Sequence, residues 1–278
     1  MIEIWKVILF GIVEGITEWL PISSTGHLIL LDEFIKLNVS TEFYNVFQVV
    51  IQLGAIMAVI VLFWKELNPF ENVNNCQFHK MSLTLNKNKM LLWFHIIIAC
   101  LPAAIVGLLF DDQIESLFYN YQCVAVALIV FGIAFIVVEN KKYHERIHSL
   151  DDMTIQTAFI IGIFQLIAAI FPGTSRSGAT ILGALLLGVS RTVATEFTFF
   201  LAVPVMFGAS LLKMIKFGFV LTMHEVIILL IGIMTSFGVS LFVIHFLMEY
   251  IKKHNFKSFG WYRIVLGIVV FIYFLLYS

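Results

Sequence analysis

Charged side chains are scarce in this chain: Asp, Glu, Lys and Arg make up 13% of its 278 residues, whereas an average soluble domain has roughly 25%. Hydrophobic residues make up 60%, and the mean hydropathy is +0.98. A soluble domain could not bury this much apolar surface. The composition therefore predicts a protein that crosses a membrane several times.

The chain also has little net charge and few cysteines. Its formal net charge is -1, and no dense basic cluster occurs, so we expect no nucleic-acid partner. Three cysteines, Cys76, Cys100 and Cys123, have neither the spacing of a metal site nor a paired spacing. We interpret them as ordinary residues.

Apolar sequence in long runs is abundant. A helix that spans a bilayer needs about 20 predominantly apolar residues. Six runs have about this length and are predicted to be transmembrane helices: 43–64, 91–110, 122–138, 197–217, 225–248 and 261–277.

Two further apolar regions, 4–31 and 154–190, are interrupted near the middle by a polar segment that contains proline. These segments are LPISSTGH and FPGTSRSGAT. Each half is too short to cross a bilayer, and non-helical backbone at membrane depth is tolerated only where protein or water covers it. Both regions are therefore predicted to be re-entrant hairpins, each of two helices joined by a loop.

The two halves of the chain resemble each other. Gly11 lies ten residues before Pro21, as Gly162 lies ten residues before Pro172. Each half holds one hairpin and three spans, and an odd number of spans inverts the second half relative to the first. We predict an all-α polytopic membrane protein with one integral-membrane domain, 1–278, built as an inverted repeat of 1–150 and 151–278.

Basic loops predict the orientation in the membrane. With six spans and two hairpins, the basic loops at 65–90, at 139–152, around Arg191 and at 249–258 fall on one side. The positive-inside rule makes that side the cytoplasm. Both termini then face out, the first hairpin enters from the outer side, and the two tips meet near the midplane. We expect an active site that faces the outer, periplasmic or extracellular, side.

Two acidic residues lie within the first hairpin. Glu14 and Glu18 are four residues apart, so on a helix they share one face. Two carboxylates held together in a low dielectric do not both ionise cheaply, so one keeps a proton or a cation lies between them. They lie about two turns and one turn before the loop, which makes reaching the surface awkward. We expect a functional site here, with both glutamates as candidate metal ligands.

Hydroxyl groups and a histidine follow these acids. Capping of a broken helix explains one of the hydroxyls of Ser23, Ser24 and Thr25, but not three. A hydroxyl beside His27 and near Glu18 also has the layout of an activated nucleophile with a base. A lone histidine in a membrane segment is more often a core residue, but in this company His27 is predicted to be functional.

The loop of the second hairpin has the composition of an anion site. Its glycines let backbone amides turn toward a ligand, and the helix N-terminus that follows favours negative charge. Arg176 adds a planar donor suited to phosphate. The alternatives are a close helix contact and a structural ion pair between Arg176 and the glutamates. The residues predicted to bind phosphate are Ser23, Thr25, Gly26, Thr174, Ser175, Arg176, Ser177 and Gly178.

Together these loops predict a polar chamber at mid-depth, with acids on one wall and an anion cradle on the other, which suits hydrolysis of a lipid phosphate. The chain resembles the undecaprenyl-diphosphate phosphatase family, the bacitracin-resistance phosphatases of bacterial membranes. The resemblance covers essentially the whole chain and rests on the segments GIVEGITEWLPISSTGH, VIQLGAIMAV, LDDMT, PGTSRSGATI and GVSRTVATEF.

The resemblance implies removal of the terminal phosphate of undecaprenyl diphosphate, which returns the monophosphate to use as a carrier in cell-wall glycan synthesis. It also implies a divalent cation, Mg²⁺ or Ca²⁺, a homodimer, and the bacterial inner membrane. Its catalytic residues correspond to Glu14, Glu18, Ser24, His27 and Arg176. Serine attack, with Glu18 or His27 managing the proton, competes with attack by metal-activated water, and the sequence does not decide between them.

Three other classes of protein fit the sequence less well. The type-2 phosphatidic-acid phosphatases need a second histidine and an aspartate shortly after their arginine, and the SGATILGALLLGVSR that follows Arg176 has neither. A transporter or flippase for the prenyl phosphate carrier also fits inverted repeats, broken helices and midplane charges. It needs an anion site but no nucleophile, so the hydroxyl, histidine and glutamate set favours the enzyme. A structural scaffold does not explain the polar tips.

Overall fold

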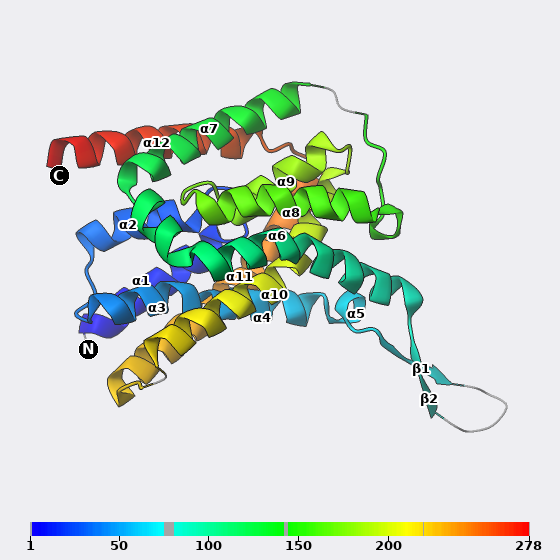
Figure 1. Cartoon of the computed structure of the whole chain (residues 1–278), viewed down its shortest axis with the longest axis horizontal. Helices are drawn as coiled ribbons and strands as arrows, with labels where there is room; N and C mark the ends of the chain where they lie inside the picture. The colour runs from blue at the N-terminus through cyan, green and yellow to red at the C-terminus, as the bar shows by residue number, and fades with distance from the viewer. Residues whose placement is uncertain (1, 75–80, 142–143, 219, 278) are drawn as a thin grey trace.

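The computed structural model describes residues 2–74, 81–141, 144–218 and 220–277, and Cys76 lies outside this part. Most of the described chain is helical (Figure 1). Its elements are α1 (Ile2–Thr17), α2 (Ser24–Phe34), α3 (Thr41–Val50), α4 (Gln52–Leu62), α5 (Trp64–Leu67), β1 (Phe70–Asn74), β2 (Met81–Leu85), α6 (Lys87–Phe118), α7 (Tyr121–Asn140), η1 (Leu150–Asp152), α8 (Ile155–Ile170), α9 (Arg176–Leu186), α10 (Arg191–Phe217), α11 (Met223–Ile251) and α12 (Lys257–Tyr277).

The six predicted spans are confirmed. Among the described residues, six helical stretches are long and apolar enough to cross a membrane, and each overlaps one predicted run. The first of them, Thr41–Leu62, is interrupted at Ile51, where α3 ends and α4 begins. The carbonyl of Val49, next to this break, accepts a hydrogen bond from Ser210 Oγ at 3.1 Å. Ser210 on α10 therefore supplies a donor to a carbonyl that would otherwise lack a hydrogen-bond partner at the break.

The span predicted at 91–110 is longer in the structure, because α6 continues to Phe118. Its last turns carry Asp111, Asp112 and Glu115, which end the hydrophobic run but not the helix. Lys216 Nζ lies 2.8 Å from Asp111 and 2.9 Å from Asp112, and Lys213 Nζ lies 2.8 Å from Glu115. These ion pairs connect the ends of α6 and α10, so the charges that ended the predicted span hold the two helices together.

The two predicted hairpins correspond to α1–α2 and α8–α9. The helices of each pair have 16 and 11 residues, which at 1.5 Å per residue gives lengths of about 24 Å and about 17 Å. Neither reaches the roughly 30 Å of a hydrocarbon core. The equal lengths are what a repeat requires, although the inverted repeat itself stays a prediction.

Each hairpin packs on helices of the other half of the chain. Helix α1 lies against α11, and α8 lies against α6. Small residues permit this close approach: a Cβ on Gly11 would lie 2.8 Å from the Thr235 side chain, and one on Gly162 would lie 2.5 Å from the carbonyl oxygen of Ala99. Helix α12 packs along α7 and contacts α2. The halves interlock, and this packing brings the hairpin tips together.

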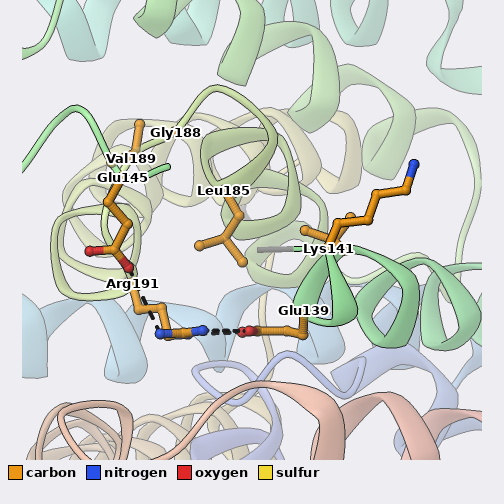
Figure 2. Close-up of a pocket in the computed structure, with 8 residues that line it drawn as sticks. Glu139, Lys141, Glu145, Leu185, Gly188, Val189 and Arg191 are labelled. Carbon is orange, nitrogen blue, oxygen red and sulfur yellow. Dashed lines mark hydrogen bonds and ion pairs between the residues drawn. The ribbon is translucent and has the colours of Figure 1, made fainter. Parts of the chain in front are cut away.

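The basic loops gather at one end of the molecule. Figure 1 shows both termini at the opposite end from the β1–β2 hairpin. Lys141, Glu145 and Arg191 line one cavity of about 260 Å³, in which Glu145 is directed at Arg191 and Lys141 points away from it (Figure 2). Arg191 donates to Glu139 at 3.0 and 2.6 Å, and a neighbouring hollow joins it to Lys252 and Lys253. The loops that were predicted to share one side therefore adjoin one another.

The antiparallel hairpin of β1 and β2 was not predicted. Its strands pair from Phe70 with Leu85 to Asn74 with Met81. It lies at the basic end, outside the six membrane helices, and we assign it no function.

Candidate active site

The loops of the two hairpins use the same backbone device. Ser23 caps α2 with φ 74°, and Ser175 caps α9 with φ 67°. Each hydroxyl accepts a hydrogen bond from the backbone N–H three residues on, Gly26 N at 3.3 Å and Gly178 N at 3.1 Å. A positive φ is costly for a residue other than glycine, and such strain gathers at functional sites. These are the two such residues in the described chain.

A hydroxyl, a carboxylate and a guanidinium meet where the tips come together. Ser24 Oγ donates to Glu18 Oε2 at 2.8 Å, and Arg176 Nη2 donates to Glu18 Oε1 at 2.9 Å. The side chains of Glu18 and Arg176 are only 6% and 12% exposed. The structure therefore brings three of the five predicted catalytic residues into one hydrogen-bonded chain that links both hairpins.

Other contacts hold Arg176 in this position. Nη1 donates to the carbonyl of Thr198 at 3.0 Å, and the guanidinium lies 5.9 Å from the ring centre of Trp19. Its Nε is buried and has no hydrogen-bond partner among the described residues. A buried donor without a partner is costly, and this one belongs to a side chain that lines a cavity. An anionic oxygen is the partner that its chemistry suits.

That cavity has a volume of about 160 Å³. It is smaller than the roughly 300–1,000 Å³ of pockets that enclose a whole ligand, so its size fits a headgroup whose tail stays in lipid. Its lining joins α4, α8 and α10 to both loops: Glu18, Ser24, Thr25, Gln52, Tyr119, Ala168, Ala169, Pro172, Gly173, Ser175, Arg176, Val205, Met206 and Ala209.

Glu14 lies beside Glu18 and is fully buried. Neither of its carboxylate oxygens has a hydrogen-bond donor among the described residues. A buried carboxylate needs a proton, a donor or a cation. No cluster of three or more His, Cys, Asp or Glu side chains suited to a metal occurs in the described chain. A cation at this place would rely on the two glutamates and on oxygens from elsewhere.

The structure directs His27 away from this centre. Its Nδ1 lies 2.7 Å from the carbonyl oxygen of Ser23, and its Nε2 lies 2.7 Å from the hydroxyl of Tyr262. A carbonyl oxygen only accepts, so Nδ1 carries the donated proton, and in the neutral ring Nε2 accepts from Tyr262. The ring also stacks on that of Tyr262. The hydrogen bonds of His27 go to Ser23 and Tyr262 and not to Ser24, and its predicted catalytic role stays a prediction.

The residues predicted to bind phosphate fall into two groups. Thr25, Ser175 and Arg176 line the cavity. The others stabilise the loops. Gly26 N donates to Ser23 Oγ, and Gly178 N donates to Ser175 Oγ. Ser177 Oγ donates to the Glu18 carbonyl at 3.0 Å, and Thr174 is fully buried. Sequence reasoning missed Gln52, Tyr119 and the buried Arg263. Only Gln52 left a signal, because it lies inside the quoted segment VIQLGAIMAV.

The fold and this centre define a class: a multi-pass membrane protein with a buried acid, hydroxyl and guanidinium site suited to phosphate chemistry. The particular family follows from comparison with known proteins. The profile of the family described as bacitracin resistance protein BacA matches residues 7–269, and the chain belongs to this family.

Curated relatives agree over their full length. The protein named undecaprenyl-diphosphatase of Desulfitobacterium hafniense is 62% identical, covering 99% of this chain and 97% of the relative. Undecaprenyl-diphosphatase 1 of Clostridium acetobutylicum is 61% identical, covering 99% and 98%. Undecaprenyl-diphosphatase of Enterococcus faecalis is 56% identical, covering 97% and 96%.

Proposed function

We propose that this protein is an undecaprenyl-diphosphatase, a membrane hydrolase that removes the terminal phosphate of undecaprenyl diphosphate. The monophosphate returns to use as a lipid carrier for cell-wall glycan, and membership of the family implies bacitracin resistance. The observation that carries the proposal is the hydrogen-bonded chain Ser24–Glu18–Arg176 inside a cavity of headgroup size. The named relatives support the same substrate.

Arg176 is the first contact of the terminal phosphate. Its free Nε and its Nη2 present two donors in a planar fork, the geometry that suits phosphate oxygens. A phosphate oxygen that accepts from Nη2 competes with Glu18 for this donor and weakens the ion pair between Arg176 and Glu18. Binding of the substrate thereby prepares Glu18 for proton transfer.

Ser24 is then the nucleophile. Its hydroxyl already donates to Glu18 at 2.8 Å, so Glu18 takes the proton as Oγ forms a bond to the terminal phosphorus. The bond from that phosphorus to the bridging oxygen breaks, and undecaprenyl phosphate leaves. Water then hydrolyses the phosphoserine and releases inorganic phosphate. Attack by an activated water in place of Ser24 is the competing mechanism.

Glu14, with Glu18 beside it, is the proposed place for a divalent cation, Mg²⁺ or Ca²⁺, and of the two only Glu14 has oxygens without a hydrogen-bond donor among the described residues. The two oxygens of Glu14 that lack a donor are of the type these ions prefer, and Mg²⁺ is commonly held by one or two carboxylates together with substrate phosphates. A bound cation would neutralise part of the charge on the phosphates.

The side of the membrane is also a proposal. The basic loops adjoin one another at one end, which supports a cytoplasmic location for that end and an active site reached from the outer side of the bacterial inner membrane. A homodimer is proposed from the resemblance alone. Labelling of single cysteines, introduced at residues 120 and 145 in a chain without its own cysteines, tests the orientation. Labelling of the cysteine at residue 145 from outside the cell would reverse the proposed orientation.

Phosphate release from undecaprenyl diphosphate by the purified protein in detergent, with and without Mg²⁺ or Ca²⁺, tests the activity. Wild type should release phosphate, and Ser24→Ala and Arg176→Ala should not. Ser240→Ala is the matched control. Ser240 is buried, as Ser24 is, and it donates one hydrogen bond, but its acceptor is the backbone carbonyl of Gly15 at 3.3 Å. Full activity in Ser24→Ala would select attack by water. No release by folded wild type would refute the phosphatase.

A flippase for the prenyl phosphate carrier remains the second candidate, favoured by the two re-entrant hairpins whose tips meet. Transport needs the anion site but not the nucleophile. A Ser24→Ala protein that moves the labelled lipid across liposomes while releasing no phosphate would support transport. A wild type that hydrolyses the lipid without moving it would remove this candidate.

A further inference from the structure

Arg263 of α12 is a fully buried cation without a counterion. Its exposed fraction is zero, and no carboxylate lies within 4.0 Å of it among the described residues. The other two buried or half-buried arginines differ, since Arg176 pairs with Glu18 and Arg191 pairs with Glu139. Burying an unpaired charge is expensive, and such residues within membrane segments are commonly functional.

Backbone carbonyls of both hairpin loops accept hydrogen bonds from the two terminal nitrogens of this guanidinium, whereas its Nε has no partner among the described residues. Nη1 donates to Pro21 O at 3.1 Å, and Nη2 donates to Gly173 O at 3.1 Å and Thr174 O at 2.7 Å. Pro21 lies between α1 and α2, whereas Gly173 and Thr174 lie between α8 and α9. One side chain from a third helix therefore connects the two tips.

The surrounding loops leave little room for any other arrangement. A Cβ on Gly178 would lie 2.9 Å from Arg263 Nη1, and the Phe131 ring centre lies 5.7 Å from the guanidinium. The preceding residue, Tyr262, contacts His27 of the first hairpin through its hydroxyl. Helix α12 thus contacts the first hairpin through both Tyr262 and Arg263, and the second hairpin through Arg263.

We infer that Arg263 is a positioning residue for the phosphatase site: it fixes the register of the two hairpin tips. The inference rests on the proposed function, because the first tip holds Glu18 and Ser24 and the second holds Arg176. A displacement of about 1 Å between reacting groups costs about 100-fold in rate.

The experiment compares Arg263→Met and Arg263→Lys with Arg191→Met, in full-length protein in detergent. Arg191→Met is the matched control, because it removes a guanidinium with a buried acid partner, and Arg191 does not line the cavity of the site. Folded protein is quantified by size-exclusion chromatography and thermal unfolding, and kcat and KM are measured for phosphate release from undecaprenyl diphosphate. All rates are given per folded protein.

We expect Arg263→Met to lower kcat by about 100-fold with a much smaller change in KM. Arg263→Lys, which keeps the charge but not the three-way hydrogen bonding, should recover part of that loss. Arg191→Met should leave kcat unchanged even where it lowers the unfolding temperature. Equal kcat in wild type and Arg263→Met would overturn the inference, and so would a lysine variant no better than methionine.

A second measurement applies where Arg263→Met does not fold. Gly178→Ala presses a methyl group against Arg263 Nη1, so its effect on kcat should be smaller when residue 263 is the shorter lysine. The two substitutions are therefore expected to couple in a double-mutant cycle, and additive losses would refute the contact. Failure of the proposed function is distinguishable, because wild type would then release no phosphate in the same assay.

Discussion

Glu18→Gln separates the chemical role of Glu18 from its structural role. The carboxylate accepts from Ser24 on one oxygen and from Arg176 on the other. A glutamine has one acceptor oxygen and one amide donor, so it keeps only one of these two bonds. The lost bond leaves a buried donor unsatisfied and costs about 1–3 kcal/mol of stability.

The kinetic effect should be larger than the effect on stability. Glutamine cannot take the proton of Ser24, and general-base catalysis contributes about 10²–10⁴ in rate, which corresponds to about 3–5 kcal/mol of barrier. We expect kcat for phosphate release, per folded protein, to fall by this factor. In the double variant with Ser24→Ala the loss should be no greater than in the larger single variant, because residues that act in one step are not additive.

Glu139→Gln is the control for this prediction. Glu139 is 3% exposed, accepts two hydrogen bonds from Arg191 and a third from the backbone N–H of Phe256, and lies outside the cavity of the site. The Glu139→Gln substitution should lower the unfolding temperature and leave kcat per folded protein unchanged. The reasoning would be refuted by equal kcat in the two glutamine variants, or by losses that multiply in the double variant of Glu18 and Ser24.

Three further predictions concern His27, helix packing and the cation. Tyr262→Phe removes the hydroxyl beside His27 Nε2 and should lower kcat less than Ser24→Ala; equal losses in the phosphate assay would place His27 in proton transfer. Gly54→Ala forces a methyl against the Ile233 carbonyl oxygen and should lower the unfolding temperature, at a cost of about 1–3 kcal/mol, whereas Gly107→Ala, with no described atom within 4 Å, should not. Glu14→Gln should raise the Mg²⁺ concentration for half-maximal activity, and an unchanged titration would remove Glu14 from the cation site.

Hydropathy carried most of the information about the fold. The six spans follow from apolar runs, because a bilayer sets a minimum length for a crossing helix. The largest error in their ends has an identifiable cause: a hydropathy run stops at charges, whereas α6 continues through Asp111 and Glu115, whose partners Lys213 and Lys216 lie about 100 residues further along the chain. Pairing across such a separation is invisible in a local pattern.

The site was predictable where chemistry is local and not where it depends on tertiary packing. The sequence predicted Glu18, Ser24 and Arg176, because carboxylates, hydroxyls and an arginine are unusual in apolar hairpins. It did not indicate that His27 would turn toward Tyr262, because that residue is 235 positions away. Arg263 was missed for the same reason, since a single arginine in an apolar run carries no motif of its own.

The two hairpins contribute unequal chemistry to one centre. In each, a serine with positive φ caps the second helix, and the next residue starts that helix: Ser24 in the first hairpin and Arg176 in the second. Both of these residues donate to Glu18. The first hairpin therefore supplies the hydroxyl and its acceptor to this hydrogen-bonded chain, and the second supplies the guanidinium. Neither hairpin forms the site alone. The site depends on the contact between the two tips, which Arg263 supports.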